Sequence, residues 1–289
     1  MLRPVTAAEY RALRPARVGP FAVNGVPFVI ESNRPEMVAR LDQVLGDLRA
    51  HDSLAVEPVV LEVNRAGPEW AGRPWAVRRD GETRAGSLEP SQVVPFLVWE
   101  VTRLLLQSVS AAVPVHASAV ALGGRALVLA GHPGSGISIL ATALVTRGWG
   151  YLADDVTVID AAGEAPVVRP FWRPLPVPPD GPLPPHVPPG MNELGLVPAS
   201  ALGALAPTSP LAAVVVPTLA PGLPPDLQPL TPAEVLVALT EHLPVTNGRG
   251  RAAFIDVAGV ASTVPGYSLA YDDLDEAEAR LRALLEAAA

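Results

Sequence analysis

Residues 115–156 read VHASAVALGGRALVLAGHPGSGISILATALVTRGWGYLADDV, and this order predicts a β-hairpin, a glycine-rich loop, a helix and a further strand. Two runs rich in strand-forming residues, 115–122 and 125–130, flank Gly123-Gly124, a pair typical of two-residue hairpin turns. The second run leads straight into GHPGSGIS, and a helix-forming segment follows. Strand, glycine-rich loop and helix in this order are the setting that a phosphate-binding loop requires.

The loop of residues 131–138 departs from the phosphate-loop pattern G-x-x-x-x-G-K-[ST] at a single position. Ile137 stands where the pattern has lysine, and the chain contains no lysine, since its 21 Lys+Arg residues are all arginine. That lysine bridges the β- and γ-phosphates of ATP, so its loss should weaken ATP binding and, more severely, transition-state stabilisation. Ser138 keeps the hydroxyl group that would bind Mg²⁺. A glycine turn that merely joins a strand to a helix is the alternative.

Two acids and two histidines near the loop are candidates for phosphate chemistry. Asp154 and Asp155 follow a predicted strand, where one carboxylate could hold Mg²⁺ and the other could accept a hydroxyl proton. A strand-end turn with two solvated acids is the alternative reading. His116 lies one strand before the loop, where a structural role is the alternative, and His132 inside the loop could donate to a phosphate or simply be exposed.

Arginines downstream of the loop are candidates to replace the missing cation. Arg169 and Arg173 are the nearest, and the planar guanidinium fork binds phosphate well. The alternative is that both are ordinary surface arginines. The chain has no HExxH or His-x-His pattern, so no zinc site is predicted, and it has no G-x-S-x-G hydrolase pattern.

Bulk composition narrows the class of protein. The 289 residues are 49% hydrophobic and 17% charged, which is typical of a globular chain. A net charge of −8 argues against a general nucleic-acid surface. The most apolar long segment, 93–109, is interrupted by Glu100 and Arg103 and is short for a membrane span. The N-terminal residues show no signal-peptide pattern, so we expect a cytoplasmic protein without nucleic-acid or membrane partners.

The segment before the loop is expected to form a small α+β region over residues 1–112. A hairpin is predicted at residues 21–30 around Asn24-Gly25, followed by a helix with Ser32 or Asn33 as its cap. Further expected elements are strands at 58–63 and 74–78, a tight turn at Asp80-Gly81 and a helix at 91–110.

Residues 113–289 are expected to form the phosphate-loop domain. Thr231, Pro232 and Glu234 give the signature of a capping box at the start of a helix that runs to about residue 242. The proline-dense segment 166–189 predicts an irregular loop. Other expected elements are helices at 138–147 and 273–287 and strands at 151–153, 156–160, 211–216 and 267–270.

The combination of His116, the glycine loop and Asp154-Asp155, in that order, resembles the HPr serine kinase/phosphorylase family, and more closely its branch of HPr-kinase-related proteins. Weaker likeness continues through RPFWRPLPV, AAVVVPTLAPG, LQPLTPAEVLVAL and VPGYSLAYDDLDEAEARLRAL, so that the resemblance covers about two thirds of the chain. The N-terminal third matches only loosely. The lysine of the family's loop is replaced by Ile137.

The resemblance implies an α/β fold: a P-loop domain of the HPr kinase/PEP carboxykinase type with a small α+β N-terminal region. It implies ATP and Mg²⁺ as cofactors if the protein is active and none otherwise, a protein or peptide partner, and a homo-oligomer. By motif position the catalytic residues would be Asp154, His116 and Asp155, and the metal ligands Ser138 and Asp155. The phosphate-binding residues would be Gly131, His132, Gly134, Ser135, Gly136 and Ser138, with Arg173 as a substitute cation.

Two functions follow from these expectations. The first is a pseudokinase or a partner- or peptide-binding module with impaired or lost phosphotransfer, which the absence of lysine favours. The second is an active ATP-dependent serine/threonine kinase of a protein or precursor peptide, with an arginine in place of the lysine, which the retained acids favour. Related branches act in the maturation of ribosomal peptides, so the resemblance implies that setting for the second function.

Overall fold

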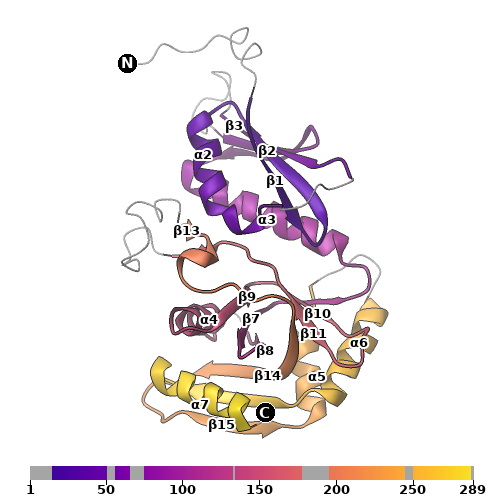
Figure 1. The fold of residues 1–289 in the computed structure, drawn as a ribbon, viewed down its shortest axis with the longest axis vertical. Coiled ribbons are helices and arrows are strands. Elements are labelled where there is room, and N and C mark those ends of the chain that lie inside the picture. Colours follow the sequence, from indigo (N-terminus) through magenta and orange to yellow (C-terminus); the bar gives the residue numbers. More distant parts are fainter. Residues whose placement is uncertain are drawn as a thin grey trace. The chain divides into compact units, whose positions relative to one another are not determined.

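The computed structural model describes residues 15–50, 56–65, 75–132, 134–177, 195–244 and 250–287. The contacts within the chain divide it into two compact units, each with its own sheet and helices (Figure 1). The first unit comprises Met1–Ser108 and Arg173–Pro198, and the second comprises Val109–Trp172 and Ala199–Ala289. The sequence predicts a division between residues 112 and 113, close to the boundary after Ser108. It does not predict that residues 173–198 return to the first unit.

The first unit is built on a five-stranded sheet in the order β1-β2-β3-β4-β5. Neighbouring strands are antiparallel except β2 and β3, which are parallel because helix α2 (Pro35–Val44) and a short 3-10 helix carry the chain back across the sheet. A two-stranded pair, β12-β13, also belongs to this unit. Its strands are β1 (Ala16–Val23), β2 (Val26–Ser32), β3 (Val59–Arg65), β4 (Trp75–Arg79), β5 (Glu82–Leu88), β12 (Leu175–Pro176) and β13 (Leu196–Val197).

Both expected hairpin turns of the first unit are confirmed. Asn24 and Gly25 join β1 to β2 with φ angles of 47° and 79°, and Asp80 and Gly81 join β4 to β5 with φ angles of 50° and 81°. Positive φ at both central positions is what a two-residue turn of this hand requires, and Asn, Asp and Gly tolerate it best.

Two helices, α2 (Pro35–Val44) and α3 (Pro90–Ser108), pack on this sheet, and the 3-10 helix η1 (Gly46–Leu48) follows α2. The expected cap at Ser32 or Asn33 is wrong, because the N-cap of α2 is Arg34 and it makes no side-chain cap bond. Ser32 is instead buried at the end of β2, where its hydroxyl donates to the carbonyl of Val63 on β3.

The second unit is built on a nine-stranded sheet. The strand order is β6-β10-β11-β14-β8-β7-β9, with β16 also paired to β14 and β15 to β16. β14 is parallel to both β8 and β16, and the other pairs are antiparallel. The strands are β6 (Val113–Val115), β7 (Ala117–Leu122), β8 (Arg125–Ala130), β9 (Gly150–Ala153), β10 (Thr157–Asp160), β11 (Val167–Arg169), β14 (Ser209–Leu219), β15 (Asp226–Leu230) and β16 (Gly266–Tyr271).

Strand β8, which leads into the glycine-rich loop, lies in the core of this sheet. Its residues from Ala126 to Ala130 are all 0% exposed, which explains their uninterrupted apolar sequence. The expected hairpin with β7 is confirmed, with φ angles of 57° and 77° at Gly123 and Gly124. The interior position of β8 holds the start of the loop on a rigid element.

The helices of the second unit are α4 (Ile137–Thr146), α5 (Pro232–Thr240), α6 (Gly250–Thr263) and α7 (Leu274–Ala287), with a 3-10 turn η2 (Ala199–Ala201). Helix α4 packs on β7, and α5 packs against α6. The capping box of α5 is confirmed, because the Thr231 hydroxyl accepts from the Glu234 amide and the Glu234 carboxylate accepts from the Thr231 amide at 2.7 Å.

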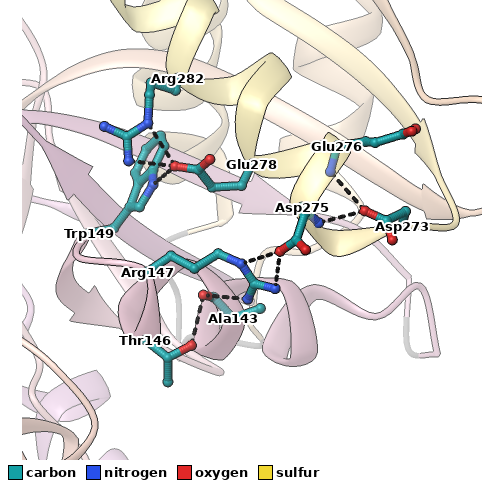
Figure 2. Close-up of polar contacts among 9 residues, drawn as sticks. All are labelled: Ala143, Thr146, Arg147, Trp149, Asp273, Asp275, Glu276, Glu278 and Arg282. Atoms are coloured by element: carbon teal, nitrogen blue, oxygen red, sulfur yellow. Dashed lines mark hydrogen bonds and ion pairs between the residues drawn. The ribbon is translucent and has the colours of Figure 1, made fainter.

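Helix α7 is tied to α4 and to the segment that follows α4 by two sets of polar contacts (Figure 2). The Arg147 guanidinium donates to Asp275 at 2.8 Å through Nε. The indole N–H of Trp149, whose side chain is fully buried, donates to Glu278 at 3.0 Å, and Arg282 binds the same oxygen at 2.8 Å. Asp273 caps α7 by accepting from the amide of Asp275 at 2.8 Å.

Several features of the second half differ from the expectations. Helix α6 and strand β15 were not expected. The proline-dense segment contains two short strands, β11 and β12, within its described part, while residues 178–189 of that segment lie outside the described residues. None of the helices in the described ranges is both long and apolar enough to cross a membrane.

Candidate functional site

The glycine-rich loop joins the buried end of β8 to the first turn of α4. Gly134 and Gly136 have φ angles of 90° and 84°, and Gly136 is the N-cap of the helix. The amide of Ser135 donates to the carbonyl of His132 at 3.0 Å, which closes a turn inside the loop. Pro133 lies outside the described residues. The amides at the start of α4 have no partners within the helix, so this end can hold an anion.

Two glycines of the loop leave no space for a side chain. A Cβ at Gly131 would lie 2.7 Å from the Ser135 hydroxyl, and one at Gly136 would lie 2.5 Å from the Tyr271 hydroxyl on β16. Tyr271 also donates to the Gly136 carbonyl at 3.4 Å, and burial raises the pKa of its phenol. The loop is therefore closely packed against β16.

The Ser135 hydroxyl oxygen is buried and has no hydrogen-bond partner among the described residues. A buried polar group without a partner is unfavourable and is rare in native proteins. A phosphate oxygen bound in the loop would give it one. The unpartnered hydroxyl and a helix N-terminus are features that a phosphate-binding loop can have, whereas Ile137 at the start of the helix supplies no charge.

Asp154 follows β9 and is the buried acid of the site, with 2% exposure. Its Oδ1 atom accepts hydrogen bonds from Ser118 on β7 at 2.5 Å and from Ser138 on α4 at 2.9 Å. The structure thus places Ser138 against Asp154. A hydroxyl and a carboxylate side by side after a phosphate loop are the ligand types that Mg²⁺ takes in such sites.

Asp155 pairs with His116 at the surface. Its Oδ1 lies 3.1 Å from the Nδ1 atom of His116, and each side chain is 41% exposed. The hydrogen bond to Asp155 raises the pKa of His116, burial opposes this, and the nearby charges of Asp155 and Asp154 add to the increase. The resemblance implies a catalytic role for His116 together with both acids, and the described ion pair of His116 is with Asp155.

His242, just after α5, is a neighbour of this site that the sequence pattern does not reveal. Its carbonyl accepts from the amide of His116 at 2.7 Å, and its ring centroid lies 6.5 Å from that of His116 and 5.3 Å from that of His132. Burial lowers the pKa of His242, and the charges of His132 and His116 lower it further. His132 also lies 3.6 Å from the carboxylate of Glu241. No local signal identifies His242, because the contact depends on how α5 packs.

The two candidate substitute cations are placed differently. Arg169 on β11 forms an ion pair with Asp160 on β10, and its Nε donates to that carboxylate at 3.1 Å. Arg173 belongs to the first unit, whereas the loop belongs to the second. Within the described part of the chain, no group of three or more His, Asp or Glu side chains is arranged to hold a metal ion.

Comparison with known proteins adds little to this picture. No protein-family model matches the chain, and no curated protein matches it in sequence. Among solved structures, the Hpr(Ser) kinase/phosphatase from Coxiella burnetii is similar over 60% of this chain and 97% of its own, with 13% identity and a TM-score of 0.33. A similarity at this level is too low to support a conclusion about function, so the site is interpreted from its own geometry.

Proposed function

We propose that the loop of residues 131–138 holds a phosphate-bearing ligand or partner and that the protein does not carry out efficient ATP phosphotransfer. In this proposal it is an HPr-kinase-like pseudokinase or a module that binds a protein or peptide partner. The observation that supports it is Ile137 at the first position of α4, in a chain without lysine. The backbone part of the anion site is retained and its fixed positive charge is missing.

Phosphoryl transfer depends strongly on positive charge near the transferred group. The transferred group spreads negative charge over its oxygens in the transition state, and catalysis depends on neutralising it. Backbone amides alone can hold an anion in its ground state, but they are a weaker substitute for a cation during transfer. Binding without turnover is therefore what this loop supports best.

Calorimetry with Mg·ATP tests the proposal directly. We expect the wild-type protein to bind Mg·ATP weakly and Ile137→Lys to bind it at least about tenfold more tightly, because the lysine restores a charged hydrogen bond. Ile139→Lys is the matched control, since Ile139 lies on the same helix and is 64% exposed. Tight binding and turnover of ATP by the wild type would overturn the proposal.

The alternative function is an active serine or threonine kinase, and the acids of the site favour it. In that case the His116–Asp155 pair would accept the proton of the attacking hydroxyl group, and Asp154 with Ser138 would hold Mg²⁺. ATP would supply the phosphoryl group, which would leave ADP and join the acceptor oxygen. Asp155→Asn should then abolish transfer of labelled phosphate to serine-containing peptides, and Asp154→Asn should abolish it too.

The two functions differ in what Asp154→Asn should change. In a binding module the variant keeps the wild-type affinity for a protein or peptide partner. In a kinase the variant loses phosphate transfer. If the wild-type protein transfers no phosphate to any peptide in a serine- and threonine-containing library, the kinase function is rejected. Only the family resemblance supports homo-oligomerisation. Analytical sedimentation measures the oligomeric state.

A further inference from the structure

A cluster of three arginines belongs to the first unit, whereas the loop of residues 131–138 belongs to the second. Arg79 ends β4, Arg84 lies on β5 and Arg103 lies on α3. Their guanidinium groups all approach the carboxyl group of Glu100 on α3, at 4.0 Å, 3.5 Å and 3.3 Å respectively. The β4–β5 hairpin and one face of α3 therefore bring three positive charges to one point.

One carboxyl group cannot balance three guanidinium groups. The Glu100 side chain is fully buried, and its Oε2 atom accepts no hydrogen bond from any described residue. The other acids nearby, Asp80 and Glu82, lie at the edge with 57% and 82% exposure, 3.9 Å from Arg79 and 4.0 Å from Arg84. Exposed pairs at such distances are strongly screened by water. The three arginine side chains, at 22%, 25% and 31% exposure, are less exposed than these two acids, so their charges are less screened.

Most of the arginine N–H groups are available to a ligand. Each guanidinium has about five N–H donors in a planar fork. Within the described ranges, Arg79 donates to Gln107 at 2.8 Å, and Arg84 and Arg103 donate only to Glu100, at 3.5 Å and 3.3 Å. Arg103 is further held by the Trp99 ring, whose centroid lies 4.8 Å from its guanidinium carbon. The three side chains are thus anchored without using most of their donors.

These side chains line a hollow of about 280 Å³. Ligand pockets commonly measure about 300–1,000 Å³, so this one suits a single small group rather than a nucleotide. All of its lining residues are polar or charged: Arg79, Asp80, Glu82, Arg84, Arg103 and Gln107.

We propose that this hollow binds the dianionic phosphate of a phosphate monoester. Glu100, Asp80 and Glu82 together equal the three guanidinium groups in formal charge, so the attraction for a phosphate dianion comes from the uncommitted N–H donors of guanidinium groups that are less exposed than Asp80 and Glu82, and not from a net charge. Planar arginine forks bind tetrahedral phosphate oxygens through paired hydrogen bonds.

The test uses the full-length protein labelled with 5-fluorotryptophan and followed by fluorine NMR. Trp99 stacks on Arg103 and is 49% exposed, so its resonance reports on this hollow, and Trp99→Phe assigns it. The probes are inorganic phosphate and O-phosphoserine, with sodium chloride at equal ionic strength as the control. We expect both probes to shift the Trp99 resonance to saturation and chloride to leave it unchanged.

Two variants and a matched control locate the binding. Arg84→Gln should weaken phosphate binding at the Trp99 resonance by about tenfold or more, and Arg84→Lys, which keeps the charge but loses the fork, should weaken it less. Arg78→Gln removes a neighbouring arginine that pairs with Glu62 at 4.0 Å, and it should bind as the wild type does. Thermal melting shows whether each variant is folded.

Three results would overturn the proposal. In the first, chloride shifts the Trp99 resonance as much as phosphate does. In the second, the Arg84→Lys protein is folded and binds phosphate as tightly as the wild type. In the third, phosphate shifts only the resonances of Trp149 and Trp172. Those two residues belong to the second unit, so that last pattern would place the phosphate outside the first unit.

Discussion

Asp155 combines an uncommon backbone conformation with a charged contact. Its φ angle is 67°, in the left-handed region that residues other than glycine rarely adopt, and its carboxylate lies 3.1 Å from His116. Such conformations cost free energy and persist where the surrounding structure imposes them, often at functional sites. Asp155 is therefore the residue of the candidate site whose local geometry is hardest to explain by folding alone.

The His116–Asp155 pair predicts a specific dependence of stability on pH. The pKa of His116 in the folded protein is raised above its ordinary value of 6.5, chiefly by the hydrogen bond to Asp155. The pair therefore stabilises the fold fully below pH 6.5, and this contribution is lost as the pH rises through the raised pKa. Asp155→Asn keeps a residue that tolerates positive φ and removes the charge.

Urea unfolding between about pH 5 and about pH 8 measures this effect. We expect the stability difference between wild type and Asp155→Asn to be largest at the acid end and to shrink as the pH rises. NMR titration should also give a lower pKa for His116 in the variant. Glu276→Gln removes an exposed carboxylate from α7 and is the control. A difference that does not change with pH would contradict the assignment of the pair.

Replacing Glu278 should lower the stability of the fold through the loss of one hydrogen bond. It is the partner of the buried Trp149 indole N–H, at 3.0 Å (Figure 2). Glu278→Ala leaves that donor without a partner and should destabilise the fold by about 1–3 kcal/mol, whereas Glu278→Gln keeps an acceptor and should cost less. Urea unfolding measures both, with the exposed Glu276→Ala as control. Equal losses for the Ala and Gln variants would show that charge, not the hydrogen bond, matters.

At the scale of elements, the approach of β16 to α5 depends on one glycine. A Cβ at Gly266 would lie 2.1 Å from a methyl group of Val235. Gly266→Ala should therefore overpack this contact and destabilise the fold by about 1–3 kcal/mol. A Cβ at Gly259 in α6 would have nothing within 4 Å, so Gly259→Ala should stabilise the fold by about 0.5–1 kcal/mol.

A double-mutant cycle identifies the cause of the Gly266 effect. In the Val235→Ala background the added methyl group gains space, so Gly266→Ala should cost less there than in the wild type. Unfolding free energies from urea titration give all four corners of the cycle. Additive effects of the two substitutions would mean that the glycine is required for backbone conformation and not for packing.

At the scale of the whole molecule, the chain leaves the second unit and returns to it. Residues 173–198 belong to the first unit, so the second unit is made of two segments, 109–172 and 199–289. We predict that these segments, joined by a Gly/Ser linker of about ten residues, fold cooperatively without the first unit. Circular dichroism and urea unfolding measure this.

The control for that prediction is the uninterrupted segment 109–289. It carries residues 173–198 without the rest of their unit and should be less soluble or less cooperative than the joined protein. A joined protein that binds a hydrophobic dye and melts without a cooperative transition would show that the second unit depends on the first for its stability.

Features that depend on neighbouring residues were predictable from the sequence. The hairpins at Asn24-Gly25, Asp80-Gly81 and Gly123-Gly124 were predicted correctly, because a two-residue turn is decided by its own two residues. The capping box of α5 is a second example, since its partners are three residues apart. Helix α6 was missed although its buried residues Ala253, Val257, Val260 and Ala261 have helical spacing, because no cap signal marks its start.

The amino-acid sequence alone was enough to predict the strand–loop–helix unit around residues 131–138 and to show that it has no lysine. Only the tertiary structure placed Ser118 and Ser138 on Asp154, set Asp155 against His116, and brought His242 next to them. It also gathered three arginines around Glu100 and returned residues 173–198 to the first unit. The difference lies in how far apart the interacting residues are along the chain. Turns and caps depend on bonds between near neighbours, whereas these contacts join distant segments through the packing of whole sheets and helices.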